Sequence, residues 1–246
     1  MSDTPVLEGV KVLDLCAYAV GPWAGTLLAQ LGADVTRIDP PYGDPIRNVM
    51  PAMHGEPTTY MSSNLGKRSA VLNLKDAGDL EVAKRLAAGA DVVIENARAG
   101  TMDRLGLGYD QLRLVNPRLV YCASSSFGDV GPLRTMGSTD PQGQAFSGFA
   151  SLNGAPGTDA EVLRYVALID LATSMYLTQA VLIGLHARRR SGQGQFIRTS
   201  QMEASLAVQT TRIGDFLAGG DAPAPLGSGS ASIVPSTNET IEPSSK

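Results

Sequence analysis

Short runs of valine, leucine and isoleucine alternate with helix-like segments along most of the chain, and this alternation constrains the fold more than any other feature of the sequence. The apolar runs are predicted strands at 10–15, 34–39, 69–74, 91–96, 118–125 and 195–200. Continuously apolar strands separated by helices are typical of a parallel sheet with both faces covered. The sequence therefore predicts an α/β fold with a Rossmann-like parallel sheet and helices on both faces.

Four segments have the pattern of helices. They cover 24–33, which follows a turn predicted at Gly21-Pro22, then 78–90, 167–190 and 202–217. The helix at 167–190 ends in basic residues before Gly192, as expected for a helix C-terminus. Residues 127–157 are instead rich in glycine, serine, threonine and proline and are predicted to form loops around a site.

Composition and charge disfavour several classes of protein. A hydrophobic content of 43% over 246 residues is enough for a sizeable core. The net charge of -4 comes from interspersed acids and bases, so neither a nucleic-acid surface nor a membrane surface is expected. The uncharged run worth testing as a membrane span, 171–185, is shorter than the about 20 residues that a span requires. The first residues, MSDTPVLEG, lack a secretory signal pattern.

The two cysteines point to a reducing compartment. Cys16 and Cys122 each lie beside a strand-like run, so both are expected to be buried and reduced. Cytoplasmic localisation follows as an expectation.

Several familiar site types do not fit the sequence. His54 and His186 are the only histidines, and no motif for a metal site is present, so no metal is expected. The first predicted strand–helix turn, LCAYAVGPWAG, matches neither GxGxxG nor GxxxxGK[ST], which disfavours NAD or ATP. No permanently bound cofactor is expected.

Basic side chains recur next to the ends of predicted strands. They are Lys67, Arg68, Lys75, Arg98 and Arg104. Because open α/β sheets bind ligands beyond the strand ends, these positions suit a ligand with several phosphates, although each residue could also be a solvated surface charge.

One acid stands at the start of the apolar helix ALIDLATSMYLTQAVLIGLHARRR. Asp170 could simply cap this helix. Alternatively it could be a nucleophile, because the helix dipole and the free backbone N–H groups of a first turn stabilise a carboxylate as its anion, and we expect it to be ionised at neutral pH. The residues alone leave both interpretations open.

Long motifs of the chain resemble, in order, the class III CoA-transferases. They are LEGVKVLDL, AVGPWAGTLLAQLGADVTRID, GDPIR, NLGKRSAVLNLK, ADVVIENARAGTMDRLGLGYDQLRLVNPRLVYCASSSFGDVGP and LIDLATSMYLTQAVLIGLHARRRSGQGQFI. This family includes formyl-CoA transferase, the carnitine CoA-transferase and bile-acid-inducible proteins, and the α-methylacyl-CoA racemases. The resemblance runs from about residue 7 to 217.

The resemblance implies a function and a set of site residues. The family moves coenzyme A from an acyl-CoA donor to a carboxylic acid acceptor through an aspartyl anhydride and an aspartyl-CoA thioester, and the matching nucleophile is Asp170. CoA or acyl-CoA is a substrate and not a resident cofactor. The positions that match CoA contacts are Leu72, Lys75, Asn96, Ala97, Arg98, Arg104, Thr139 and Asp140. The family also implies a second small domain and an interlocked dimer.

The chain departs from the family pattern in three places. Thr139 replaces the histidine of the racemase branch, which argues against racemisation because threonine is a poor base. Ala97 and Pro40 stand where an aromatic ring and an arginine could contact CoA. The composition from residue 219 onward predicts a flexible linker or tail over 219–246, after a CoA-binding domain over 1–218.

The third departure leaves alternatives open, because the residues expected to form the small domain are not seen. The chain could be truncated, could be completed by a partner as a homodimer or heteromer, or could be a non-catalytic CoA-binding or scaffolding subunit of a heteromeric CoA-transferase.

Overall fold

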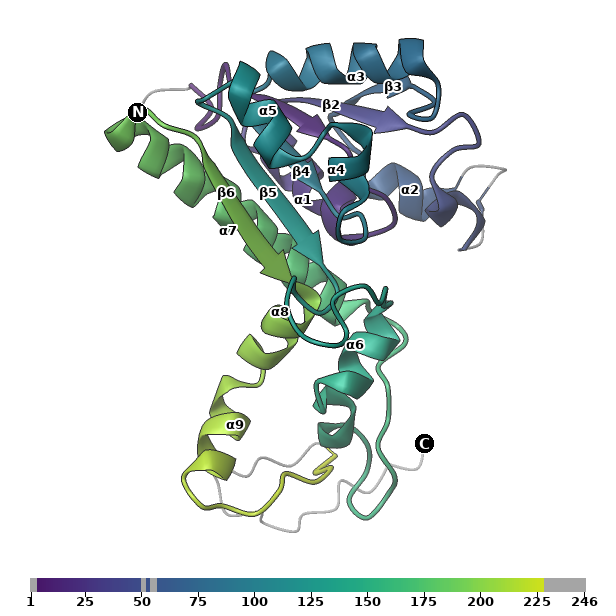
Figure 1. Ribbon diagram of the computed structural model, residues 1–246. Coiled ribbons are helices and arrows are strands. Elements are labelled where there is room, and N and C mark those ends of the chain that lie inside the picture. The colour runs from purple at the N-terminus through teal and green to yellow at the C-terminus, as the bar shows by residue number, and fades with distance from the viewer. Residues whose placement is uncertain (1–3, 50–51, 54–56, 228–246) are drawn as a thin grey trace.

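The computed structural model describes residues 4–49, 52–53 and 57–227, and it contains one six-stranded parallel sheet (Figure 1). The strand order is β3-β2-β1-β4-β5-β6. The strands are β1 (Lys11–Asp14), β2 (Asp34–Asp39), β3 (Arg68–Val71), β4 (Val92–Glu95), β5 (Val120–Ser125) and β6 (Gln195–Ser200). All six predicted strands are present. From β1 the sheet grows one way through β2 and β3 and the other way through β4, β5 and β6, and this arrangement confirms the Rossmann-like α/β prediction.

Helices cover both faces of the sheet. α1 (Val20–Gln30) and α7 (Leu168–Ser191) pack on one face, where Leu28 and Leu177 meet Val92 and Val120. α3 (Ala77–Ala88), α4 (Thr101–Leu105) and α5 (Tyr109–Val115) cover the other face, around Val93. Burial on both faces explains why the central strands are continuously apolar.

The turn predicted at Gly21-Pro22 is wrong, because both residues lie inside the first turn of α1. Proline fits there since the first N–H groups of a helix have no partner within the helix. The chain turns earlier, at Tyr18, whose φ of 63° lies in the left-handed region. A Cβ at position 21 would lie 2.1 Å from Cys16 Sγ, so only glycine lets α1 begin so close to β1.

The segments at 127–157 and 202–217 also differ from their predictions. The first contains α6 (Asp140–Phe146) and a 3-10 helix, η2 (Phe149–Leu152). The second is two helices, α8 (Gln201–Ala207) and α9 (Thr210–Leu217). Two further short helices, η1 (Pro45–Asn48) and α2 (Thr58–Ser62), follow β2.

The helices α6, α8 and α9 lie beyond the carboxyl ends of β5 and β6, away from the rest of the sheet (Figure 1). No side chain of α9 is buried among the described residues. Residues 221–227 have no regular structure, and 228–246 lie outside the described residues, as does His54. The predicted division between 1–218 and 219–246 stays a prediction.

By length and composition alone, α7 could cross a membrane, being longer than the uncharged run 171–185 suggested. Its inner side chains, among them Leu177, Val181 and Leu185, instead join the core against the sheet. A core helix of this kind passes the same compositional test, so the feature is weak evidence for a membrane span.

Candidate active site

Asp170 lies at the carboxyl edge of the sheet, where α/β proteins bind their ligands. It occupies the first turn of α7, and its side chain is partly buried. Two other elements reach it from distant parts of the sequence: α6, through Asp140, and the start of α8, through Gln201. The fold thus brings the glycine-rich segment, the apolar helix and the end of the last strand together.

The start of α7 is capped by Asp140 and not by Asp170. Asp140 Oδ2 accepts hydrogen bonds from the backbone N–H groups of Ile169 (2.7 Å) and Asp170 (3.0 Å). The N-cap position itself, Ala167, has no side chain that could form the bond. The capping interpretation of Asp170 is therefore wrong, and so is the expectation that its carboxylate draws on the free N–H groups of the helix.

Asp140 is itself held rigidly. Only 5% of Asp140 is exposed, and its Oδ1 accepts a hydrogen bond from Gln144 Nε2. The Gln144 side chain also bonds to both backbone groups of Leu163, at 2.9 Å each. Thr139, the residue before, starts α6, where Gln142 Oε1 accepts from its backbone N–H at 2.9 Å, and its side chain is exposed.

Gln201 makes the one side-chain hydrogen bond to Asp170 within the described part of the chain. Its Nε2 donates to Asp170 Oδ1 at 2.6 Å, and its Oε1 accepts from Ser138 Oγ. The Ser138 backbone N–H in turn donates to Ser126 Oγ at 2.9 Å. A chain of hydrogen bonds therefore links the end of β5 to the Asp170 carboxylate.

The environment of Asp170 disfavours its charge. The pKa of Asp170 is raised from 3.8 to about 7: burial is the largest cause, the nearby negative charge of Asp140 adds to it, and the hydrogen bond from Gln201 opposes both effects. The expectation that Asp170 is fully ionised at neutral pH is therefore wrong, because a carboxyl with this pKa is about half protonated there. A carboxylate that is poorly stabilised and partly accessible suits a nucleophile better than a structural role.

Six of the residues that match CoA contacts follow β3 and β4 in the sequence. Leu72, Ala97 and Arg98 lie directly after β3 and β4, at the same edge of the sheet as Asp170, and Lys75 and Arg104 carry exposed cations close by in sequence. Asn96 is occupied within the protein: its side chain accepts from the backbone N–H of Ala17 and donates to the Ala17 carbonyl, both at 2.8 Å. Its role as a CoA contact remains a prediction, as does that of every residue in this set.

Ala97 and Arg98 also line a cleft of about 270 Å³ between β4, β5, β6 and the helices α4 and α5. Its floor includes Tyr121, whose hydroxyl is buried and has no hydrogen-bond partner among the described residues. Glu95 lies beside it, and burial raises the pKa of Glu95 to about 7.

Three backbone N–H groups of the first strand–helix turn are used within the protein. Cys16 donates to Asp14 Oδ1 at 3.0 Å, Ala17 donates to Asn96 Oδ1 at 2.8 Å, and Tyr18 donates to both oxygens of Asp44 at 3.2 Å. These three N–H groups are therefore not available to a phosphate.

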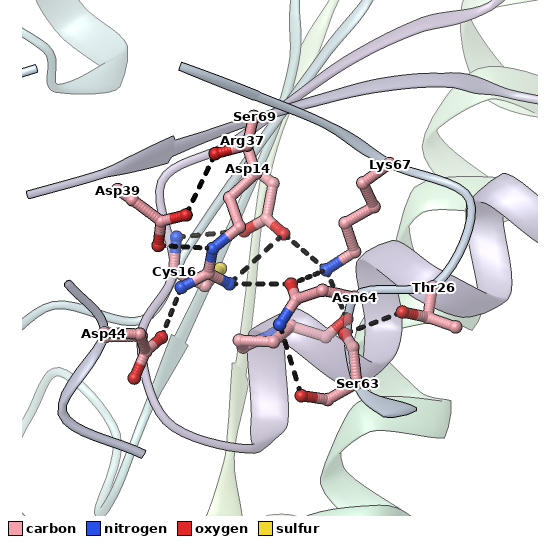
Figure 2. Close-up of polar contacts among 12 residues, drawn as sticks. Asp14, Cys16, Thr26, Arg37, Asp39, Asp44, Ser63, Asn64, Lys67 and Ser69 are labelled. Carbon is pink, nitrogen blue, oxygen red and sulfur yellow. Dashed lines mark hydrogen bonds and ion pairs between the residues drawn. The ribbon is translucent and has the colours of Figure 1, made fainter. Parts of the chain in front are cut away.

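Asp14 and Asp44 belong to a buried network around Arg37 (Figure 2). Arg37 contacts Asp39 at 2.8 Å, Asp44, and Asp14 at 4.0 Å. Lys67 Nζ lies 2.8 Å from Asp14 Oδ2, so this buried lysine is not available to a ligand, contrary to the sequence expectation. Arg68 likewise pairs with Asp34, at 2.5 Å.

Sequence reasoning missed Gln201, Ser138 and Gln144. Gln201 could most easily have been predicted from the sequence, because it directly follows a predicted strand and ligand sites of α/β folds lie beyond strand ends. Among the described residues no group of three histidine, cysteine or acidic side chains could hold a metal ion.

Comparison with known proteins finds relatives that are named as CoA-transferases. Residues 7–238 match the model of CoA-transferase family III. The acetyl-CoA:oxalate CoA-transferase of Acetobacter aceti is 37% identical over 221 residues, which are 89% of this chain and 57% of that protein. The beta subunit of the succinyl-CoA–L-malate CoA-transferase of Chloroflexus aurantiacus is 34% identical over 200 residues, which are 80% of this chain and 49% of that protein.

A solved structure agrees with the sequence comparisons. The crystal structure of a CAIB/BAIF family protein from Brucella suis superposes with a TM-score of 0.87 and 33% identity, covering 92% of this chain and 61% of the other. The chain thus spans about half to three fifths of the length of the relatives that it matches.

Proposed function

The chain belongs to CoA-transferase family III, and from this premise we propose that it moves coenzyme A from an acyl-CoA donor to a carboxylic acid acceptor. The observation that carries the proposal is the state of Asp170. It is a partly buried acid at the ligand-binding edge of the sheet, and its pKa is raised to about 7.

We propose that Asp170 is the nucleophile. Its carboxylate attacks the thioester carbonyl of the donor; a C–O bond forms, the C–S bond breaks, and the CoA thiolate leaves a mixed anhydride. The thiolate then attacks the Asp170 carbonyl carbon, which forms an aspartyl-CoA thioester and releases the donor acid. The acceptor carboxylate repeats the two steps in reverse. No proton is consumed overall, and each step replaces one activated acyl bond by another.

Asp140 would prepare the nucleophile in this scheme. By accepting the Ile169 and Asp170 N–H groups it fixes the start of α7, and its charge keeps the Asp170 carboxylate poorly stabilised. A carboxylate that gains little from its surroundings loses little when it becomes an ester-like anhydride. This favours the first step.

For coenzyme A we propose the edge of the sheet between β3 and β4 as the nucleotide region. Leu72 and Ala97 offer apolar surface there, and Lys75, Arg98 and Arg104 are exposed cations that can meet phosphates. In the first turn, the N–H groups of Cys16 and Tyr18 are already used by Asp14 and Asp44. Thr139 adjoins Asp140 and would lie beside the thioester.

The remaining part of the active site is expected from polypeptide outside these residues, in the same chain or in a partner. Supporting this, the chain spans 57% of the Acetobacter relative, and one relative is named as a beta subunit. An interlocked homodimer or a heteromer would meet this need, and a cytoplasmic location stays a prediction.

The proposal is tested by trapping the acyl-enzyme. The protein is incubated with acetyl-CoA or succinyl-CoA in the presence of hydroxylamine, which converts an anhydride or thioester at Asp170 to a hydroxamate that mass spectrometry can locate. We expect modification at Asp170, none in D170N, and normal modification in D159N, which removes an exposed acid.

The alternative function is a non-catalytic CoA-binding or scaffolding subunit of a heteromeric CoA-transferase. Calorimetric binding of CoA without any trapping at Asp170, with or without a partner chain, would overturn the transferase proposal in favour of this alternative.

A further inference from the structure

We propose that Gln201, held in place by Ser138, is the residue that positions the Asp170 carboxylate: it fixes Oδ1 and leaves Oδ2 free to attack. The inference rests on the proposed function, because it takes Asp170 as the nucleophile. Its starting point is the hydrogen bond of 2.6 Å from Gln201 Nε2 to Asp170 Oδ1.

The backbone of Gln201 is fixed by the sheet. β6 ends at Ser200, which pairs in register with Ser125 of β5, and Gln201 is the first residue of α8. Only 4% of Gln201 is exposed. A side chain anchored in this way holds its amide within a narrow range of positions, which is what precise orientation of a nucleophile requires.

The direction of the Gln201 amide is also set. Ser138 Oγ donates to Oε1, and Ser138 is itself tied to Ser126 through its backbone N–H. A rotation of the amide would turn Oε1 toward the Asp170 carboxylate and break the bond from Ser138. The NH2 group therefore faces the carboxylate, where it favours the anion.

Glycine at position 143 lets the α6 backbone close over this amide. A Cβ there would lie 3.0 Å from Gln201 Cδ and 3.1 Å from its Oε1, which is too close for an undisturbed side chain. The Gln201 side chain extends from α8 and is held by α6 and by the segment before α6. Its NH2 group points at Asp170.

Charged groups near Asp170 do not replace this bond. The titratable or charged side chains on the elements packed against the start of α7 are Asp140 of α6, Glu203 of α8, Arg198 of β6, and Cys122 and Tyr121 of β5. Arg198 pairs with Asp129 at 2.9 Å, and Glu203 accepts from Ser200 Oγ at 2.9 Å. α1 carries no ionisable side chain. Of these groups, Asp140 acts on Asp170 through its charge, and it opposes ionisation by raising the pKa of Asp170.

Two consequences follow for the reaction. With Oδ1 occupied, attack on the thioester falls to Oδ2, for which no hydrogen bond is found in the described part of the chain. The same bond lowers the pKa of Asp170 and so raises the fraction of nucleophilic anion near neutral pH.

The decisive experiment compares Q201M with Q209M. Methionine keeps the size of the side chain and removes the amide. Gln209 is a matched control because it is equally buried, at 5% exposure, and bonds to the Ser147 and Ser205 carbonyls without touching Asp170. The pKa of Asp170 is measured directly by carbon-13 NMR of the side-chain carboxyl in each protein. We expect an upward shift of about one unit in Q201M, a smaller upward shift in S138A and no shift in Q209M. An unchanged pKa in Q201M would overturn the inference.

The pH profile of hydroxylamine trapping separates this inference from the proposed function. We expect Q201M to be trapped more slowly at every pH, because the orientation of Oδ2 is lost, and to lose about tenfold more below pH 7 than at pH 9, where the anion is restored. A loss of the same size at all pH values, or no loss at pH 9, would count against the inference. If the NMR shift is present but no protein is trapped, the transferase proposal fails while the Gln201–Asp170 linkage stands.

Discussion

Two buried groups of carboxylates lie at the same edge of the sheet, and they are treated in opposite ways. Around Arg37, the acids Asp14, Asp39 and Asp44 are each met by a cation at ion-pair distance. At the other end of the edge, the one side-chain partner of the Asp170 carboxylate among residues 4–49, 52–53 and 57–227 is the neutral amide of Gln201, and a second acid, Asp140, lies nearby. The pKa of Asp39 is lowered, and that of Asp170 is raised to about 7.

The difference separates structure from chemistry. A carboxylate that is paired and fully hydrogen-bonded is stable as an anion and has little tendency to react, so it serves to hold loops in place. A carboxylate that is desolvated without a cation is costly to the fold but available to an electrophile. The following four experiments test this contrast, from the largest expected effect to the smallest.

Replacing the shared cation should have the largest effect. R37M leaves Asp39 and Asp44 without their cation, and Asp14 with Lys67 alone, in a site where Arg37 itself is 1% exposed. We expect the free energy of unfolding to fall by about 3 to 5 kcal/mol. Urea unfolding measures this. R68M is the matched control, since Arg68 forms an exposed pair with Asp34 and should cost no more than about 1 kcal/mol. Equal losses in the two variants would contradict the structural role of the network.

Replacing Asp170, the acid without a cation partner, should change the free energy of unfolding in the opposite direction. The pKa of Asp170 in the folded protein, about 7, exceeds the ordinary value of 3.8. The charge therefore destabilises the fold increasingly between about pH 4 and pH 7 and by a constant amount above that. We expect D170N to be more stable than the wild type by about 2 kcal/mol at pH 8, with no advantage at pH 4. Denaturation curves at both values check the sign, and a loss of stability at pH 8 would argue that Asp170 is a structural acid.

How much of this contrast the sequence reveals depends on how local each feature is. The sheet, its helices and the position of Asp170 could be predicted, because strand periodicity and the start of an apolar helix are read within about ten residues. Lys67 was misjudged because its partner, Asp14, is distant in sequence and meets it only once β1 and β3 take their places around β2. Asp140 as the cap of α7 and Gln201 as the partner of Asp170 depend on the same long-range assembly.

Two errors had more specific causes. The predicted turn at Gly21-Pro22 failed because proline and glycine also fit the first turn of a helix, here with Cys16 packed against Gly21. Asp170 was expected to be ionised because of the helix dipole and the free N–H groups. That expectation failed because Asp140, from another helix, accepts the hydrogen bonds of those N–H groups.

Removing the charge of Asp140 should make the pKa of Asp170 more like that of the paired acids. In D140N the negative charge near Asp170 is removed, so the pKa of Asp170 should fall, which carbon-13 NMR would detect. The amide keeps an oxygen for the Ile169 and Asp170 N–H groups but presents its NH2 to Gln144 Nε2, donor against donor. We expect a loss of about 1 to 2 kcal/mol in the free energy of unfolding. A raised pKa in this variant would show that the cap, and not the charge, controls Asp170.

The smallest effect concerns one hydrogen bond at the border of the paired region. Tyr60 donates from its hydroxyl to Asp39 Oδ2 at 2.7 Å, and its ring supports the Arg47 guanidinium, whose Cζ lies 3.4 Å from the ring centroid. Y60F keeps the ring and removes only the donor, so we expect unfolding to cost about 1 kcal/mol less. Because the pKa of Asp39 lies below its ordinary value, this acid is ionised throughout pH 5 to 8 and the deficit should be constant over that range.

The stability difference for D170N should instead change with pH over the lower part of the same interval. Two acids at one sheet edge, one giving a flat pH dependence and the other a sloping one, would be the direct thermodynamic signature of paired and unpaired carboxylates. A sloping deficit for Y60F would place Asp39 among the unpaired acids and remove the contrast.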